Sequence, residues 1–156
     1  MSDPLSIASA IAGLLTLTAK IASTARALCS AVKDAPASIR QIEEEMSDLN
    51  VVFCQVQLFI SGSTKVPKKS RLPDISLDHL MATLTGCVLI ISALDKKLSD
   101  VAGLREAGVH TGTSTSGRLL VEKIKWALWK EAEVNDLIED LQRHKLSLNL
   151  MLNGKL

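Results

Sequence analysis

The sequence predicts an all-α protein, an up-and-down bundle of four long helices formed by one domain over residues 1–156. In three segments, apolar side chains recur at alternating spacings of three and four residues, which places them on one helical face for about seven turns each. The chain is 47% hydrophobic but has only two Phe, two Trp and no Tyr. Such an aliphatic core suits packed helices better than an aromatic-rich β-sandwich, and 156 residues suffice for one core.

The first three helices follow directly from these apolar stripes. We expect them over residues 4–33, 36–61 and 75–102. Pro4 and Pro36 then fall in the first turns of two helices, where proline is tolerated, and Asp3 caps the first of them. The three stripes are Ile7, Ile11, Leu14, Thr18, Ile21, Ala25, Leu28 and Val32; Ile39, Ile42, Met46, Leu49, Phe53, Val56 and Ile60; and Leu77, Leu80, Leu84, Cys87, Ile91, Leu94, Leu98 and Val101.

The fourth helix, predicted over residues 118–152, has a less regular pattern. Its stripe is interrupted by Glu131 and again by Lys145, so we expect a bend or a change of packing partner between residues 126 and 131. The closing segment LSLNLML alternates as a strand does. Since no second strand is available to pair with it, we predict that it is helical.

The opening stretch is unusually apolar, because residues 4–19 carry no charged side chain. A secretory signal needs basic residues before its apolar run, and here Asp3 precedes it. A membrane-spanning helix needs about 20 apolar residues, whereas this run is shorter and contains serine and threonine. We therefore interpret it as a bundle helix that is more apolar than an average surface helix.

The loop before the fourth helix carries the glycine spacing of a P-loop without its functional residues. Gly112 and Gly117 are spaced as in that motif, but Arg118 and Leu119 stand where a P-loop has Lys and then Ser or Thr. No predicted strand precedes the loop. We interpret it as a connector.

Residue types that often carry catalysis are scattered along the chain. His79, His110 and His144 have no neighbours at zinc-ligand spacing. The cysteines are odd in number, lie far apart and form no C-x-x-C pair: Cys29, Cys54 and Cys87. We therefore expect reduced thiols in a cytosolic protein, with no metal, no cofactor and no enzyme activity.

Basic residues leave two interpretations open. The net charge of +1 gives no general attraction to nucleic acid, so no nucleic-acid partner is expected. A small basic cluster beside an apolar helix is either a solvated surface or a site for anionic lipid headgroups. The residues concerned are Lys20, Lys65, Lys68, Lys69 and Arg71.

Acidic and aromatic residues on the second and fourth helices also have two interpretations. Glu43, Glu44 and Glu45 form either a solvated face or a patch for a basic partner. Trp126 and Trp129 are three residues apart on one helix and serve either as packing anchors or as partner-binding residues.

Two motifs carry a resemblance to a known family. The opening MSDPLSIASAIAGLL is similar to the start shared by many fungal proteins, and the WALWK segment at 126–130 with QRHKLSLNL at 142–150 is similar to a second signature of that group. The chain thus resembles the N-terminal domains of fungal STAND and NLR-like receptors, which are related to HeLo and HeLo-like domains.

The resemblance implies a helical bundle that acts in fungal programmed cell death, including heterokaryon incompatibility and innate immunity. Such a domain self-associates on activation and targets anionic membrane lipids through its N-terminal helix. It precedes a receptor region or an amyloid motif, and moves from the cytoplasm to the plasma membrane. The matching positions are Leu5, Ile7, Ile11, Gly13, Leu14, Leu15 and Leu17. The alternative is a protein-interaction module that regulates such a receptor without membrane activity.

Overall fold

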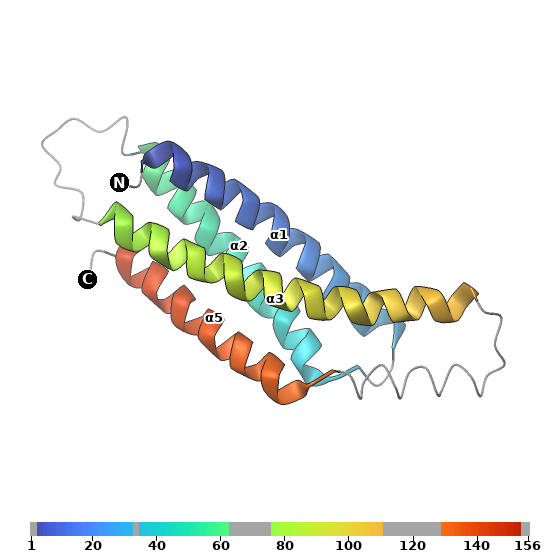
Figure 1. Ribbon diagram of the computed structural model, residues 1–156. Helices are drawn as coiled ribbons and strands as arrows, with labels where there is room; N and C mark the ends of the chain where they lie inside the picture. The colour runs from blue at the N-terminus through green and yellow to red at the C-terminus, as the bar shows by residue number, and fades with distance from the viewer. Residues whose placement is uncertain (1–2, 33–34, 63–75, 111–128, 154–156) are drawn as a thin grey trace, which may run out of the picture.

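The computed structural model describes residues 3–32, 35–62, 76–110 and 129–153, with side chains described except at 104–110. These residues form four helices: α1 (Pro4–Ala31), α2 (Ala37–Gly62), α3 (Leu77–His110) and α5 (Glu131–Leu152) (Figure 1). The described residues contain no strand, and the prediction of an all-α helical bundle is confirmed.

The four helices occupy the corners of a square. Both α1 and α5 pack against α2 and against α3, so α1 lies diagonally across from α5 and α2 diagonally across from α3 (Figure 1). Consecutive helices along the chain are therefore not always neighbours in space.

The directions of the helices follow from contacts between them. Thr18 and Arg26 of α1 bond to Asn50 and Glu43 of α2, respectively, so α1 and α2 are antiparallel. In the same way, Ser38 and Glu45 of α2 meet Trp129 and Lys145, so α2 and α5 run parallel.

The remaining pair of neighbours, α3 and α5, is antiparallel. Lys97 bonds to Glu133, whereas Gly86 lies against His144 further along α5. It follows that α1 and α3 are parallel neighbours, as Figure 1 shows, and that the first turn of α1 and the last turn of α5 lie at the same end of the bundle.

The predicted stripes form the core. Every member of the first stripe is buried; in the second only Ile60 is partly buried, and in the third Leu77 alone is exposed. On α5 the buried residues have the same spacing except across Lys145: Val134, Ile138, Leu141, Leu148 and Met151.

The N-terminal cap of α1 has the predicted form. The Asp3 carboxylate accepts a hydrogen bond from the Ser6 N–H at 2.6 Å, and Pro4 occupies the first helical position. This bond satisfies one of the donors that a helix leaves free at its start.

Two helix boundaries differ from the prediction by more than two residues. α3 runs on to His110, past the expected end at 102, since good helix formers surround Gly103 and outweigh it. α5 begins at Glu131, and Lys130 before it has a non-helical backbone with ψ of 89°. The segment LSLNLML is helical, as predicted. Residues 111–128, which include the predicted start of the fourth helix, lie outside the described residues.

Candidate functional site

The residues proposed for membrane targeting divide between two faces of α1. Ile7, Ile11 and Leu14 are at most 1% exposed and belong to the core. Leu5 is 80% exposed, and Gly13 lies at the surface with no atom within 4 Å of the position its Cβ would take. The other two, Leu15 and Leu17, are partly buried against the core. The seven positions are therefore not one surface: α1 has a buried inner face and an outer face.

A group of hydrogen bonds around Thr18 joins the inner face of α1 to α2. The hydroxyl of the buried Thr18 donates to the Leu15 carbonyl at 3.1 Å and accepts from the Asn50 amide at 3.1 Å. The same amide lies 3.4 Å from the Leu15 carbonyl. Separation of α1 from α2 must break the Thr18–Asn50 hydrogen bond as well as the apolar packing. This loss costs free energy wherever a buried polar group is left without a partner.

The basic residue of α1 that was predicted as a lipid-headgroup candidate lies at the boundary with α3. Lys20 forms an ion pair with Asp95 of α3 at 3.2 Å, and its side chain is 59% exposed. It is thus accessible from solvent at the α1–α3 junction. The other candidates, Lys65, Lys68, Lys69 and Arg71, lie outside the described residues.

The three acidic residues predicted as a partner-binding patch face in different directions. Glu43 pairs with Arg26 of α1 at 2.8 Å, whereas Glu44 is exposed. Glu45 is buried between α2 and α5 and accepts bonds from Gln142 at 2.6 Å and Lys145 at 2.7 Å. Only Glu44 is therefore left as an exposed member of the patch.

The Glu45–Lys145 pair is a feature that the sequence analysis missed. Glu45 occupies a core-facing position of α2. Lys145 occupies the position of α5 where its apolar stripe would otherwise continue. Burial acts to lower the pKa of Lys145, but its bonds and its attraction to Glu45 and Asp48 outweigh burial and raise it. The sequence contained two signs of this pair: Lys145 interrupts the apolar stripe of the fourth helix, and Glu45 stands directly before the stripe residue Met46.

The tryptophan that the structure describes is a packing anchor. Trp129 is 5% exposed, and its indole N–H donates to the Ser38 hydroxyl at 2.9 Å. It therefore fastens the start of α5 to the start of α2 and presents no surface to a partner. Trp126 lies outside the described residues.

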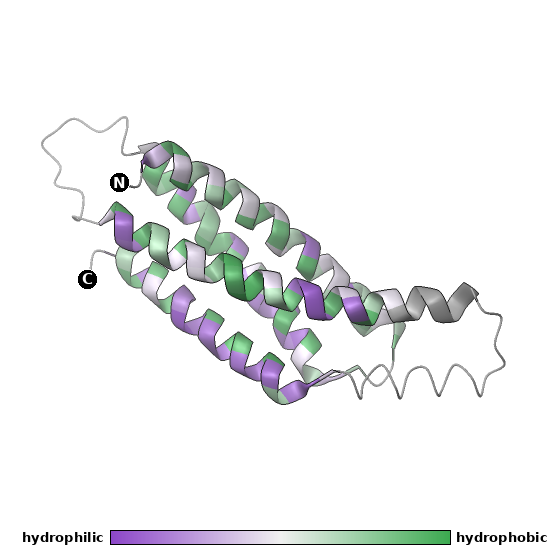
Figure 2. Ribbon diagram, viewed as in Figure 1, coloured by the Kyte–Doolittle hydropathy of each residue, from purple (hydrophilic) through white to green (hydrophobic). Residues whose placement is uncertain are grey.

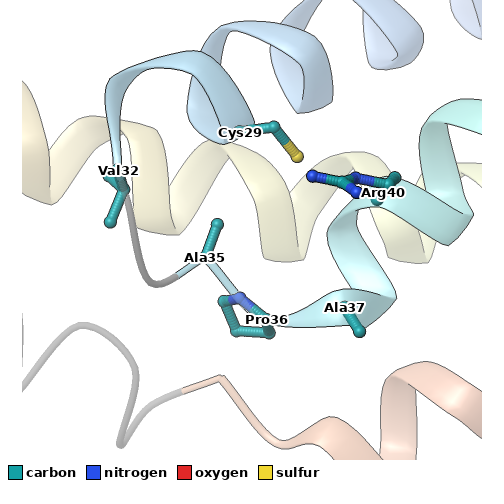
Figure 3. Close-up of a pocket in the computed structure, with 6 residues that line it drawn as sticks. All are labelled: Cys29, Val32, Ala35, Pro36, Ala37 and Arg40. Atoms are coloured by element: carbon teal, nitrogen blue, oxygen red, sulfur yellow. The ribbon is translucent and has the colours of Figure 1, made fainter.

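A hollow of about 240 Å³ lies where α1 is followed by α2. Figure 3 shows the Cys29 thiol and the Arg40 guanidinium pointing toward each other across it. Burial raises the pKa of the Cys29 thiol and Glu43 adds to the rise, while Arg40 opposes it. A thiol with a raised pKa is a poor nucleophile, so this arrangement does not favour cysteine chemistry. The lining residues are Cys29, Val32, Ala35, Pro36, Ala37 and Arg40.

Cys87 lies in the core, and the described His, Cys and acidic residues form no cluster suited to a metal ion. Burial raises the pKa of Cys87 in the core to about 12. Within the described ranges, no group of three or more His, Cys, Asp or Glu side chains could hold a metal ion.

Two helices are long and apolar enough, by length and composition, to cross a membrane: α1 over its whole length and Leu77–Gly103 of α3. Core helices of soluble proteins pass the same test, so this finding alone is weak. The apolar window is 28% buried in α1 and 33% buried in α3. In α1, residues such as Leu15 and Leu17 are partly buried against the core.

In the comparisons with family models, curated proteins and solved structures, nothing matches this chain.

Proposed function

We propose that this chain is a HeLo-like effector or signalling domain of fungal programmed cell death, which acts on membranes through α1. The observation that carries the proposal is the two-sided character of that helix. Its inner face fills the core with residues such as Ile7 and Ile11, while its outer face has no charged residue before Lys20. A helix of this kind is compatible with a protein core and with lipid.

The closed bundle is the resting state in this proposal. Release of α1 into water would expose its inner stripe at about 1.5–3 kcal/mol for each large apolar side chain and would break the Thr18–Asn50 bond. Hydrocarbon removes most of the apolar cost. We therefore propose that self-association and contact with anionic lipid shift the equilibrium toward a membrane-bound form, since a ligand favours the state that it binds better.

The test uses charge substitutions on the outer face, because a substitution in the core would unfold the bundle. Leu5→Glu and Gly13→Glu leave the core intact, and the second replaces a helical glycine by a better helix former. With vesicles of phosphatidylcholine and phosphatidylserine, we expect each variant to lose binding and dye release by about tenfold or more, since a charge on a lipid-facing position is costly.

The matched control is Leu146→Glu, which charges an exposed leucine on α5, the helix diagonal to α1. It should bind and permeabilise vesicles as the wild type does. A wild-type protein that ignores these vesicles, or outer-face variants that release dye as well as the wild type, would contradict the proposal.

A second candidate function, a protein-interaction module, is favoured by two exposed residues of α2. Val51 and Leu58 are 58% and 71% exposed and lie seven residues apart, on one helical face. In that case Leu58→Glu should abolish self-association measured by sedimentation, and neither the wild type nor the variant should bind vesicles.

A further inference from the structure

We propose that the closed bundle first docks on a lipid bilayer through a charge-free face that α1 and α3 share, before α1 leaves the core. This inference rests on the proposed function and adds a second helix to the membrane contact. We define the docking face as the exposed side chains of residues 5–19 and 80–94.

The uncharged segments of the two helices lie side by side. Residues 5–19 of α1 and 80–94 of α3 contain no Asp, Glu, Lys, Arg or His. The two helices are parallel neighbours (Figure 1), and Lys20 pairs with Asp95 at 3.2 Å, one residue beyond each segment. The two segments therefore start and end at the same levels.

The same ion pair shows which flanks of the helices meet. Gly13 precedes Lys20 by seven residues and Val88 precedes Asp95 by seven, so each lies two turns earlier on the same flank. Gly13 and Val88 consequently lie on the flanks of α1 and α3 that are turned toward the α1–α3 junction. Both are exposed, Val88 at 37%.

The docking face carries large apolar residues that the bundle leaves in contact with water. Leu5 and Leu89 are 80% and 68% exposed, respectively. Figure 2 shows the contrast: hydrophilic residues recur along α5, whereas α1 and α3 are mostly apolar or neutral where the two segments lie. Apart from Val88, the other exposed positions of the face have small side chains: Ser6, Ser9, Ala12, Gly13, Thr16, Ala19, Ala82, Thr85 and Ser92.

Threonine hydroxyls on the docking face are already satisfied within their own helices. Thr16 donates to the Ala12 carbonyl at 3.1 Å, and Thr85 donates to the Met81 carbonyl at 2.8 Å. Burial of a hydroxyl without a partner would cost free energy, and these bonds reduce that cost in hydrocarbon.

Charged residues border the docking face at both ends. Asp3 and Asp78 stand before the two segments, and Lys20 and Asp95 stand after them. At 1.5 Å per residue the face is about 22 Å long. A bundle lying flat on the bilayer would keep these charges at the headgroups, with the long Lys20 side chain able to reach them.

The composition of the face favours lipid over a second copy of the chain. Protein interfaces are enriched in aromatic residues and Arg, which supply most of their binding energy. Residues 5–19 and 80–94 contain no aromatic residue and no Arg. Small and aliphatic side chains without charge suit an acyl environment instead.

The test places charges on the α3 half of the face in the full chain. Leu89→Glu removes an apolar contact and adds a charge, whereas Ser92→Glu adds only the charge. Because both positions are exposed, the free energy of unfolding should change little. Sedimentation with vesicles of phosphatidylcholine and phosphatidylserine should show binding weakened by about tenfold or more for each variant, and unchanged for the control Leu146→Glu.

The outcomes separate this inference from the proposed function. If both α3 variants bind as the wild type does while Leu5→Glu does not, α3 takes no part and only the inference fails. If the wild type binds no vesicles, both proposals fail. If the wild type self-associates without lipid and Leu89→Glu makes it monomeric, the face belongs to a second copy and lipid docking is overturned.

Discussion

Gly86 shows how one residue can set the spacing of two helices. It lies in the interior of α3, where glycine is about 1 kcal/mol less favourable than alanine. A Cβ at this position would lie 2.8 Å from Cδ2 of His144 and closer still to its Nε2, so only glycine admits the ring. The ring is held there because His144 Nδ1 lies 2.7 Å from the Asp140 carbonyl.

We predict that Gly86→Ala destabilises the bundle by about 1 kcal/mol despite the better helix propensity of alanine, since the ring or the helices must move. The control is Gly103→Ala in the same helix, where a Cβ meets nothing within 4 Å. That change should stabilise by about 1 kcal/mol. Urea unfolding measures both. Similar effects of the two substitutions, or a cost of Gly86→Ala that remains in a His144→Ala background, would refute the steric explanation.

At the scale of elements, α2 and α5 are joined by an ion pair as well as by apolar packing. Glu45 is 7% exposed and bonds to Lys145 and Gln142. Asp48 lies 3.4 Å from the same ammonium group. Removal of one member of such a pair leaves a buried charge with fewer partners, whereas replacement of both by apolar side chains is often close to neutral.

We predict that Lys145→Met destabilises the protein by about 1–3 kcal/mol, because Glu45 loses its cation. The double variant Glu45→Leu with Lys145→Met should recover most of that loss. A double-mutant cycle by urea unfolding measures the coupling. Additive effects of the two substitutions would show that the pair contributes no interaction energy.

The helices were predictable from sequence because their inner faces are almost entirely apolar. The stripe from Ile7 to Val32 is buried throughout, because its spacing of three and four residues matches the helical repeat. Lys145 could not be placed in the same way, since its burial depends on a carboxylate in another helix. Likewise, the end of α3 was missed because Gly103 suggests a loop, although a single glycine does not stop a helix.

The candidate site was less predictable than the core. Periodicity identifies Leu5 and Gly13 as off the inner stripe, but it cannot show which helix lies beside them. The α1–α3 junction depends on the packing of α1 against α3 rather than on the order of the helices along the chain. Similarly, the run from Glu43 to Glu45 appears as one acidic cluster in sequence, and the structure distributes it over three directions.

On the scale of the whole molecule, the bundle has two unlike sides. The side formed by α2 and α5 is held by charged and polar contacts, such as Glu45–Lys145. Between α1 and α3, Lys20 and Asp95 form an ion pair at the end of the uncharged segments of the two helices. Because polar contacts hold α5 to α2 and α3, loss of α1 would uncover core residues without breaking these pairs.

The same charged contacts make the stability of the whole bundle depend on pH at both extremes. Bonds from Lys97 and then Lys130 lower the pKa of Glu133 below its ordinary value of 4.5. A lowered carboxyl pKa stabilises the folded state above the ordinary value, and this contribution is lost as the pH falls through the folded-state value. For Lys145 the pKa is raised above its ordinary 10.5, so its contribution is present below 10.5 and is lost as the pH rises beyond it.

We therefore predict a free energy of unfolding that is flat through neutral pH and falls below about 4.5. On the alkaline side it should fall from about 9, because the Cys87 thiol, whose pKa burial raises to about 12, ionises first in the unfolded state, and further above about 10.5 as Lys145 loses its proton. Urea unfolding across the pH range would show it, and the chain has no Tyr to titrate on the alkaline side. Glu133→Gln should make the free energy of unfolding fall less steeply at acid pH, and Lys145→Met should make it fall less steeply at alkaline pH. Glu131→Gln, at a neighbouring exposed position, serves as the control. If the free energy of unfolding fell as steeply at acid pH in Glu133→Gln as in the wild type, the Lys97–Glu133 pair between α3 and α5 would contribute nothing to folding. Solvent screening would then cancel the attraction between the two charges.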